Sequence, residues 1–383
     1  MTTPAPRAVN HATRRHPPRT TLLSIVAIAI TAALIGCAPA GEGEEPEPER
    51  TAVFPSMPEP IISEDYPGLL RARRLLGEPR SGKDWHSGIW ASGDMASGER
   101  VEAFGEWRGT AVDAITMYPS NETWEKIRTS EWHIATFDAS DAVLSYGLPL
   151  LPVNSGDTLA DVANGKQDGV FREVADLLVA HGRGNSIVRL GWEANGAWFP
   201  WNATVNTADD YKAAYRNVVG VMKEQAPDLI FDFDIGCGVS LRGQENRLDA
   251  LTTLYPGDDV VDLIGCDTYD WHHTTVTDEA SWESAQRPKN SPGIADVADF
   301  AKSRGKGLSY PEWGVASEEE GGMGDNPFFI TKMRGFFEDH ADILVLEAYF
   351  SEPDTSLANS IWDPVQMPLS SEEYRRLWGD SGE

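Results

Sequence analysis

Cysteine, histidine and basic side chains are scarce in this sequence. The 383 residues include 3 Cys and 8 His, and 32 Lys and Arg stand against 60 Asp and Glu, a net charge of −28. A chain this acidic repels phosphate backbones, so we expect no nucleic-acid partner. No Cys or His spacing matches a zinc site, and the adjacent pair His272–His273 lies in an expected loop, where neighbouring side chains diverge. We therefore expect no metal site.

The N-terminal residues have the composition of an export signal. Four arginines precede the uncharged, largely apolar run Thr20–Gly36, which ends in Leu34-Ile35-Gly36-Cys37. A small residue before Cys, behind an apolar run, resembles the lipobox of bacterial lipoprotein signal peptides. We expect residues 1–36 to be a lipoprotein signal peptide and a lipid on Cys37 to anchor an exported, cell-surface chain to the membrane. An uncleaved anchor, which needs about 20 apolar residues, or an ordinary secretory signal is the alternative.

The segment that follows cannot form a core of its own. Residues 37–60 are rich in Glu, Pro and Gly, a composition that buries too little apolar surface to fold, so we expect an extended tether. Residues 61–383 form the expected domain, with a lead-in of one short helix and a core over about residues 85–380. A monomer is expected.

Two cysteines remain beyond Cys37. Cys237 and Cys266 fall near the ends of two successive expected strands. A disulfide between them is geometrically possible in an oxidising compartment. Two unpaired buried thiols fit the sequence equally well.

Short apolar runs alternate with amphipathic helical patterns from about residue 85, which is the signal of repeated βα units. Eight such strands over about 300 residues predict a (β/α)8 barrel, with the working residues at the C-terminal ends of the strands. The alternative is an open doubly wound sheet, but the turn after Trp90 lacks that fold's Gly-rich phosphate pattern. The expected strands are Ser87–Trp90, Val112–Tyr118, Val143–Val153, Ile187–Trp192, Leu229–Gly236, Val260–Asp267, Gly307–Glu312 and Ile343–Phe350.

Two glutamates are placed to share the mouth of this barrel. Glu193 lies just past the fourth expected strand, in a stretch with four aromatic residues, and Glu312 ends the seventh. Two carboxyl groups across one cleft are the minimal machinery of glycoside hydrolysis, because one donates a proton while the other attacks or activates water. Unequal environments can separate their pKa values for these roles.

The stretch around Glu193 resembles glycoside hydrolase family 26, the β-mannanase family. The chain has Arg189-Leu-Gly-Trp-Glu193-Ala-Asn195-Gly-Ala-Trp198-Phe-Pro-Trp201, where the family has Arg-x-x-His-Glu-x-Asn-Gly-x-Trp-Phe-x-Trp. Asp267-Thr-Tyr269 is similar to the Asp-x-Tyr of the family's sixth strand, and Tyr310-Pro-Glu312-Trp-Gly314 looks like its nucleophile end. The resemblance covers residues 85–380.

The resemblance implies a retaining double displacement without a metal or organic cofactor. Glu193 is then the acid–base and Glu312 the nucleophile, with carboxyl groups about 5–5.5 Å apart. Tyr269 would orient Glu312, Arg189 would support its charge, and Trp198 would stack on a sugar ring. Other residues implied to bind the polysaccharide or oligosaccharide substrate are Asp267, Trp192, Asn195, Trp201, Trp90, Tyr118, Trp313 and Tyr349.

One position departs from the family pattern. Trp192 stands where the mannanases have a His that contacts the substrate near the cleavage point. β-Mannan, β-1,3-xylan and mixed-linkage β-glucan therefore all remain expected substrates. Residues 270–293 and Glu318–Gly324 are expected to form the cleft walls. The competing functional hypothesis is a non-catalytic carbohydrate-binding lipoprotein on the same barrel.

Overall fold

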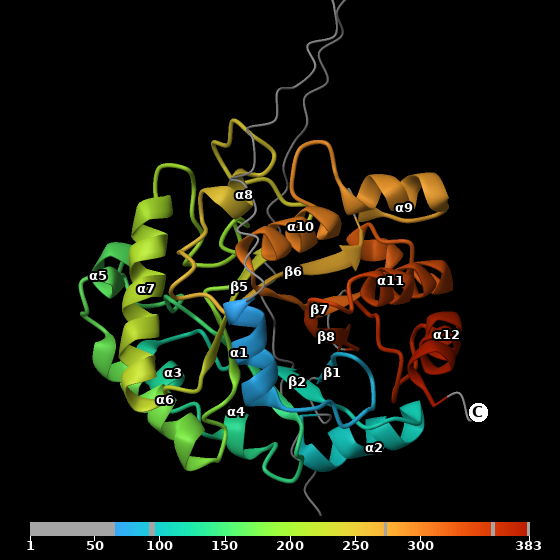
Figure 1. Ribbon diagram of the computed structural model, residues 1–383, viewed down its shortest axis with the longest axis horizontal. Coiled ribbons are helices and arrows are strands. Elements are labelled where there is room, and N and C mark those ends of the chain that lie inside the picture. The colour runs from blue at the N-terminus through green and yellow to red at the C-terminus, as the bar shows by residue number, and fades with distance from the viewer. Residues whose placement is uncertain (1–65, 92–95, 272–273, 354–356, 381–383) are drawn as a thin grey trace, which may run out of the picture. The chain divides into compact units, whose positions relative to one another are not determined.

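The strands close into one parallel barrel in sequence order (Figure 1). The computed structural model describes residues 66–91, 96–271, 274–353 and 357–380. Each strand pairs in parallel with its sequence neighbours, and β8 closes on β1. This confirms the (β/α)8 prediction and excludes the open sheet. The strands are β1 His86–Ala91, β2 Ala114–Met117, β3 Val143–Leu148, β4 Ile187–Leu190, β5 Ile230–Gly236, β6 Leu263–Asp270, β7 Gly307–Val315 and β8 Leu344–Ser351.

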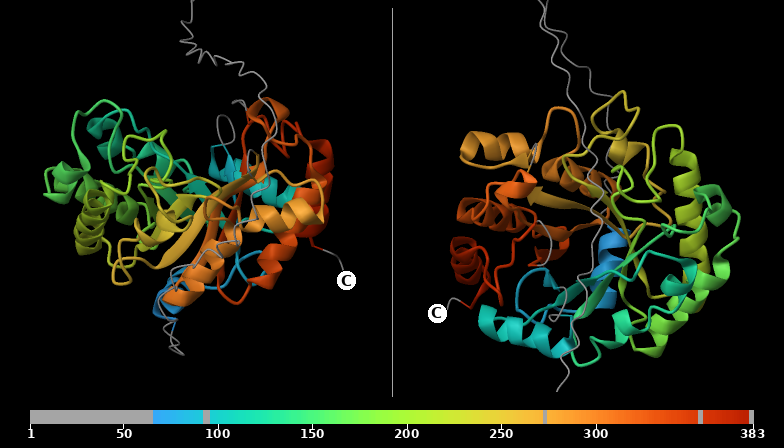
Figure 2. Two further views of the ribbon diagram at one scale, coloured as in Figure 1. Left: turned by 90° about the horizontal axis from the view of Figure 1, so that it is seen from above. Right: turned by 180° about the vertical axis from the view of Figure 1, so that it is seen from behind.

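Helices surround the barrel on all sides (Figure 2). The sequence predicts the helices at α3, α6, α7, α10, α11 and α12, but not α2 or α9. None of the helices in the described ranges is long and apolar enough to cross a membrane. The helices are α1 Pro67–Leu76, α2 Gly98–Arg108, α3 Trp124–Arg128, α4 Trp132–Ala135, α5 Leu159–Ala163, α6 Asp168–Ala180, α7 Ala208–Gln225, α8 Asp249–Thr252, α9 Glu279–Gln286, α10 Ile294–Arg304, α11 Pro327–Asp339 and α12 Pro368–Trp378, with the 3₁₀ turn η3 Glu318–Glu320.

Several predictions concern residues beyond these ranges. The predicted signal peptide of residues 1–36, the predicted lipid on Cys37, the predicted tether of residues 37–60 and the pair His272–His273 all lie outside the described residues.

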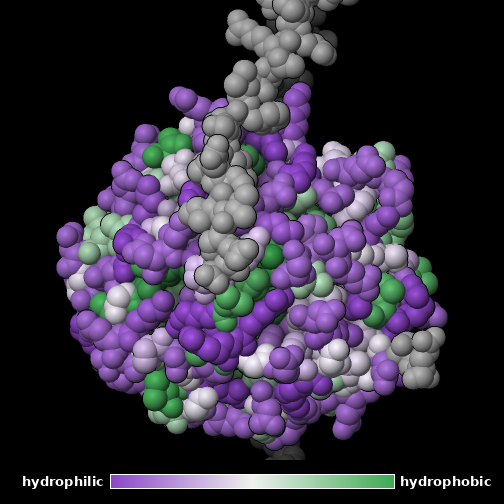
Figure 3. Space-filling view, in the orientation of Figure 1, coloured by the Kyte–Doolittle hydropathy of each residue, from purple (hydrophilic) through white to green (hydrophobic). Residues whose placement is uncertain are grey.

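The face seen in Figure 3 is mainly hydrophilic, with small scattered apolar spots. That surface agrees with the large acidic excess of the chain.

The lead-in helix α1 lies at the end of the barrel where the strands begin. Gly68 sits so close to the chain before β6 that an added Cβ would lie 2.7 Å from the carbonyl oxygen of Asp262. Arg71 then bonds the Asp262 carboxylate at 2.9 Å and the Leu229 carbonyl at 3.0 Å. The helix therefore closes the N-terminal end of the barrel and leaves the opposite end for chemistry.

Helix α7 begins directly after Thr207, a residue type that often caps a helix with its side chain. Thr207 occupies the N-cap position, yet its side chain makes no cap hydrogen bond. Its hydroxyl instead accepts from the Thr204 backbone N–H at 2.9 Å and so fixes the preceding loop. Asp209 and Asp210 lie in the first turn, where negative charge is favoured by the helix dipole.

The inside of the barrel combines small and charged side chains. Arg189, Asp232 and Asp234 are at most 1% exposed and come from the neighbouring strands β4 and β5. Space for them comes from glycine: a Cβ on Gly265 of β6 would lie 2.1 Å from the hydroxyl oxygen of Ser309 on β7. Most outward residues of the strands are apolar and pack on the helices, which gives the core its hydrophobic shell.

Candidate active site

A pocket of about 610 Å³ opens at the C-terminal ends of the strands. Glu193 and Glu312 both line it, as the barrel placement predicts. The predicted wall segments contribute Trp271, which follows β6, and Glu320 of η3. The remaining lining residues are Trp90, Trp198, Phe199, Val239, Tyr269, Phe350, Glu352 and Leu357.

A left-handed backbone turn carries Glu193 from β4 into the pocket. β4 ends at Leu190, and the next residues include Gly191 at φ 56° and Glu193 at φ 50°. This region costs a residue with a Cβ about 1–2 kcal/mol, so the surrounding contacts have to impose it. One such contact is the hydrogen bond from the Glu193 backbone N–H to the Asp234 carbonyl at 3.0 Å.

Asn195 supplies the other contacts that hold this turn. Its amide nitrogen donates to the carbonyls of Gly236 at 2.8 Å and Val239 at 3.0 Å. Its amide oxygen accepts from the Gly236 N–H at 2.9 Å. The side chain is 3% exposed and is fully used in joining the turn to the end of β5, so the prediction that Asn195 binds substrate is corrected to a supporting role.

The carboxyl group of Glu193 lies half-buried beside an exposed indole. Trp198 donates its Nε1–H to Glu193 Oε2 at 2.7 Å, and the Trp198 side chain is itself 53% exposed. Burial raises the pKa of Glu193 to about 8, and the negative charges of Glu312 and Asp234 add to this rise. Glu193 is therefore protonated at neutral pH and can donate a proton into the pocket.

Glu312 has the opposite surroundings, since each of its oxygens accepts a hydrogen bond from a tyrosine. Tyr269 donates its hydroxyl to Oε1 at 2.6 Å, and Tyr118 donates to Oε2. Burial raises the pKa of both tyrosines well above the ordinary value, so both remain neutral donors. Arg189 Nη1 lies 3.9 Å from Oε2. These groups stabilise negative charge on Glu312 and fix its orientation.

A bulge in β7 brings Glu312 to this position. The pairing of β7 with β8 shifts between Tyr310 and Trp313, and Pro311, which has no N–H to donate, falls inside the shift. Thr116 of β2 donates its hydroxyl to the Pro311 carbonyl at 2.7 Å across the barrel. The sequence predicts that β7 ends at Glu312. The strand instead continues to Val315, so Glu312 lies within it.

Arg189 is held beneath the pocket by two carboxylates. Its Nη2 lies 3.1 Å from Asp234 and 2.5 Å from Asp267, and all three side chains are fully buried. Asp267 therefore contacts Arg189 and lines no part of the pocket. No group of three His, Cys, Asp or Glu side chains in the described ranges is arranged to hold a metal ion.

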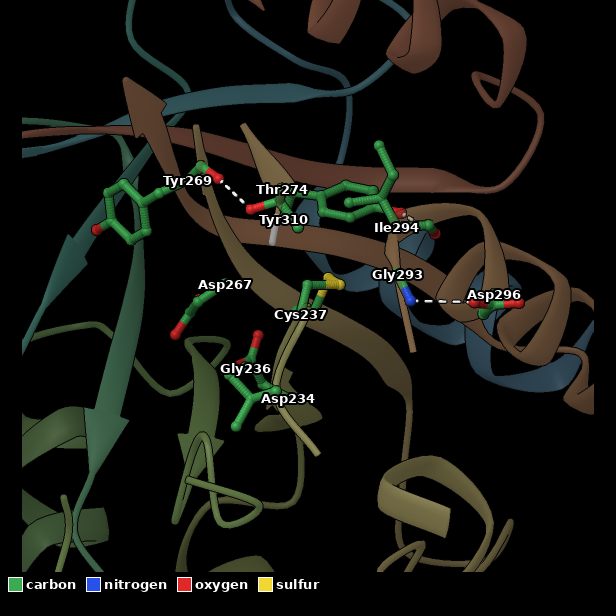
Figure 4. Close-up of a disulfide and its surroundings, with 12 residues drawn as sticks. Asp234, Gly236, Cys237, Asp267, Tyr269, Thr274, Gly293, Ile294, Asp296 and Tyr310 are labelled. Carbon is green, nitrogen blue, oxygen red and sulfur yellow. Dashed lines mark hydrogen bonds between the residues drawn. A yellow bond between two sulfur atoms is a disulfide. The ribbon is translucent and has the colours of Figure 1, made fainter. Parts of the chain in front are cut away.

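A disulfide lies next to this ion-pair cluster (Figure 4). Cys237 and Cys266 are bonded, with Cα atoms 5.5 Å apart, which decides between the two alternatives left open by the sequence. The bond joins the residue after β5 to β6 directly before Asp267, and the Cys237 N–H donates to the Asp267 carbonyl at 2.9 Å. It therefore braces the two strands that carry the carboxylate partners of Arg189.

Aromatic side chains cover the pocket walls. Trp90 at the end of β1 stacks on Phe350 of β8 with ring centroids 3.9 Å apart. Trp271 tilts against Tyr269 at 4.8 Å, and Trp198 stands exposed on the other side of the pocket. The predicted substrate contacts Trp90 and Trp198 thus lie in the pocket, whereas Phe350 was missed.

Trp313 and Tyr349 lie on the wrong face of the barrel to bind substrate. Both side chains are 0% exposed. Trp313 donates its Nε1–H to Glu347 at 2.7 Å and stacks on Trp378 of α12, while Tyr349 donates to the Asn359 carbonyl at 2.9 Å. The prediction is wrong because successive strand residues face opposite sides, and each follows or precedes a residue that points inward.

Trp192 and Trp201 support the pocket from behind. Trp201 is 0% exposed and donates its Nε1–H to the Trp192 carbonyl at 2.7 Å. Trp192 is 6% exposed and packs against Tyr118 and Phe199, with ring centroids 4.8 Å away in each case. Neither side chain lines the pocket, so direct substrate contact is wrong for both.

Comparison with known proteins shows what this barrel resembles. Residues 168–306 match the model of glycosyl hydrolase family 26. The chain is 27% identical over 212 residues to endoglucanase H of Acetivibrio thermocellus, which covers 51% of this chain and 21% of that protein. It is 30% identical over 194 residues to a mannan endo-1,4-β-mannosidase of Bifidobacterium adolescentis, covering 47% of this chain and 18% of that protein. The chain thus spans about a fifth of the length of these curated relatives.

Solved structures show the same fold. A Cellulomonas fimi endo-β-1,4-mannanase double mutant superposes with a TM-score of 0.57 at 18% identity, over 82% of this chain and 74% of the other. The catalytic domain of a Bacillus sp. JAMB-750 family 26 endo-β-1,4-mannanase gives a TM-score of 0.54 at 16% identity, over 82% and 91%. At these identities the likeness shows the fold, and the match to the model of glycosyl hydrolase family 26 over residues 168–306 shows which family that part of the chain resembles.

Proposed function

We propose that the protein is a retaining glycoside hydrolase that cleaves internal linkages of a β-linked polysaccharide, with β-mannan as the first candidate. The observation that carries this proposal is the contrast between two glutamates in one pocket. Burial raises the pKa of Glu193 to about 8, whereas Glu312 accepts a hydrogen bond on each oxygen beside a guanidinium group. A protonated acid facing an oriented carboxylate is the arrangement that double displacement requires.

In the first step Glu312 attacks the anomeric carbon and forms an ester bond to the sugar. The glycosidic bond breaks as Glu193 transfers its proton to the departing oxygen, so the leaving sugar departs as a neutral alcohol. Esterification removes the negative charge of Glu312, which is one of the causes that raise the pKa of Glu193. Glu193 is then free to stay ionised in the intermediate, as the second step needs.

In the second step Glu193 takes a proton from water while the water oxygen attacks the anomeric carbon. The ester bond to Glu312 breaks, and both glutamates return to their starting states with the anomeric configuration retained. Tyr269 and Tyr118 hold the leaving carboxylate in place. Trp198 has two functions here, since its exposed ring can stack on a sugar while its Nε1–H orients Glu193.

The substrate and the endo action rest on the relatives. An endoglucanase and a mannan endo-1,4-β-mannosidase are among the proteins this chain resembles, and both names describe cleavage within a β-linked glucan or mannan. The pocket wall adds aromatic side chains suited to sugar rings, namely Trp90, Trp198 and Trp271.

The test is a reducing-sugar screen on β-mannan, β-1,3-xylan and mixed-linkage β-glucan. We expect one of these to be cleaved by the full chain, and Glu312→Ala to lose at least about a thousandfold in rate. Glu283→Ala, on the exposed side of α9, is the matched control and should keep full activity. If no β-glycan is cleaved while a glycan still binds, the non-catalytic carbohydrate-binding function replaces this proposal.

We further propose that the chain is exported and anchored to the cell surface through a lipid on Cys37. Support comes from the sequence alone, in the arginine-rich start and the apolar run that ends at Cys37. In a bacterial host that is fed a labelled fatty acid, the full chain should take up label and sediment with membranes, and Cys37→Ala should do neither. Equal labelling of both chains would contradict the anchor.

A further inference from the structure

Tyr118 connects the buried cation beneath the pocket to the carboxylate above it. Tyr118 directly follows β2, and its hydroxyl accepts a hydrogen bond from Arg189 Nη1 and donates one to Glu312 Oε2. Arg189 itself lies 3.9 Å from that oxygen, beyond hydrogen-bond distance. Tyr269 lines the pocket, whereas Tyr118 does not. The two tyrosines therefore reach Glu312 from different sides.

Three neighbours fix the ring of Tyr118. Gly147 of β3 lies directly against it, because an added Cβ would come within 2.3 Å of Cδ1. Trp192 packs on the ring at a centroid distance of 4.8 Å, and the guanidinium carbon of Arg189 lies 5.4 Å from its centroid. Trp192 is the residue that departs from the family pattern, and its contact in this structure is with Tyr118 rather than with the pocket.

Arg189 is connected to Glu312 by hydrogen bonds through the hydroxyl of Tyr118. Two buried carboxylates, Asp234 and Asp267, already pair with Nη2. Nη1 points its hydrogen bond at the Tyr118 hydroxyl, which in turn donates to Glu312. A hydroxyl that accepts from a cation is a stronger donor, because the two hydrogen bonds polarise one another.

We propose that Tyr118 is a second residue that positions the nucleophile, and that Gly147 and Trp192 act through it by holding its ring in place. With one tyrosine on each oxygen, the carboxylate of Glu312 is held in a single plane. With Tyr269 alone, it could rotate about its last bond. This inference rests on the proposed role of Glu312 as nucleophile.

Loss of the Tyr118 hydroxyl should change the pH dependence of the rate, whereas loss of packing alone should not. A hydrogen-bond donor to the carboxylate of Glu312 disappears, so the negative charge of this group is stabilised less. The acid limb of kcat/KM, which reports the ionisation of groups in the free enzyme, should move upward. The titratable and charged groups that face Glu312 are Arg189 and Glu193 from the β4 segment, Asp234 from β5, and Asp267 and Tyr269 from β6.

The experiment compares Tyr118→Phe with Tyr146→Phe in the full chain on the glycan found by the screen. Tyr146 is a fully buried tyrosine on β3 whose hydroxyl bonds Ser130 at 2.8 Å, away from the pocket. For Tyr118→Phe we expect kcat to fall about ten- to a hundredfold, KM to stay within about threefold, and the acid limb to rise by about one pH unit. Tyr146→Phe should leave kcat and the limb unchanged. The same pH profile for both variants would overturn the inference.

A second pair of variants tests positioning with the hydroxyl still present. Gly147→Ala should displace the Tyr118 ring and reproduce the upward shift of the acid limb of kcat/KM. Gly335→Ala on α11, where a Cβ meets nothing within 4 Å, should not. A Gly147→Ala protein that keeps its melting temperature and the wild-type pH profile would contradict the proposed role of Gly147 in holding the Tyr118 ring. Glu312→Ala separates the two proposals: if it stays active, the proposed function fails, and if only Tyr118→Phe is normal, this inference fails.

Discussion

Replacing Glu193 by Gln should make the folded protein more stable at alkaline pH while it removes the proposed proton donor. The pKa of Glu193 is raised from 4.5 to about 8, first by burial and then by the charges of Glu312 and Asp234. In the unfolded chain the carboxyl group ionises near pH 4.5. Between these two values the folded state binds more protons than the unfolded state, so wild-type stability falls as pH rises from about 4.5 to 8. Gln does not titrate and avoids this loss.

The magnitude follows from the width of that pH window. At about 1.4 kcal/mol for each pH unit between the two pKa values, the ceiling is about 5 kcal/mol. Because neighbouring Glu312 and Asp234 share the repulsion, we expect about half of this, or about 2–3 kcal/mol, at pH 8.5. For a domain of about 300 residues that is a rise of about 4 °C in melting temperature. Gln keeps the left-handed backbone and can accept the Trp198 hydrogen bond, so the comparison isolates the charge.

The assay is thermal unfolding of wild type and Glu193→Gln at pH 4 and pH 8.5 in the same salt. Near pH 4 both side chains are neutral and the two melting temperatures should agree. At pH 8.5 the variant should melt higher, and the exposed control Glu283→Gln should match wild type at both values. An equal difference at both pH values, or a variant that melts lower at pH 8.5, would refute the electrostatic reasoning.

Three further outcomes are expected. Trp198→Phe removes a donor whose hydrogen bond lowers the pKa of Glu193, so the alkaline limb of kcat should move up from about pH 8 by roughly half a pH unit, measured in a pH–rate profile. Replacing Cys237 and Cys266 by Ser opens a bridge between residues 29 apart and should lower stability by about 3–4 kcal/mol, seen as a melting temperature about 5 °C lower under non-reducing conditions. Gly265→Ala places a methyl group 2.1 Å from a side chain of β7 and should destabilise the barrel by about 3 kcal/mol or more in denaturant unfolding.

The barrel could be predicted from sequence because each strand is an apolar run between turn signals. The residues at which the strands end are harder to predict from the sequence. The sequence predicts that β3 runs to Val153, but Pro149 and Pro152 lack the N–H groups that a ladder needs, and the strand stops at Leu148. Helix α2 was missed because Gly98 and Gly105 weaken its helical signal.

The sequence identifies the two carboxyl groups of the site, Glu193 and Glu312, but not the orientation of their aromatic neighbours. Near the mouth of the barrel aromatic residues are adjacent in the sequence, as in Tyr349-Phe350, so the sequence does not show which of the two points inward. The sequence therefore predicts Tyr349 as a pocket residue, whereas Phe350 is the one that lines the pocket. The places of Trp192 and Trp201 depend on the positive φ angles at Gly191 and Glu193, which no residue pattern announces.

Two features of the site depend on distances between elements far apart in the sequence. The spacing of Cys237 and Cys266 allowed a disulfide but could not give the Cα separation of 5.5 Å that a bridge requires. Tyr118 could be assigned to the end of β2, but its double hydrogen bond depends on how far β4 and β7 lie across the barrel. Long-range geometry of this kind is absent from local sequence.

The most direct test of the account is to trap the covalent intermediate on Glu312. A 2-deoxy-2-fluoro β-glycosyl fluoride of the cleaved sugar should inactivate the enzyme with one sugar bound per chain. Mass spectrometry of the digested protein should then place that sugar on the peptide that contains Glu312. A label on a different residue, or turnover of the true substrate by Glu312→Ala at the wild-type rate, would contradict the central claim.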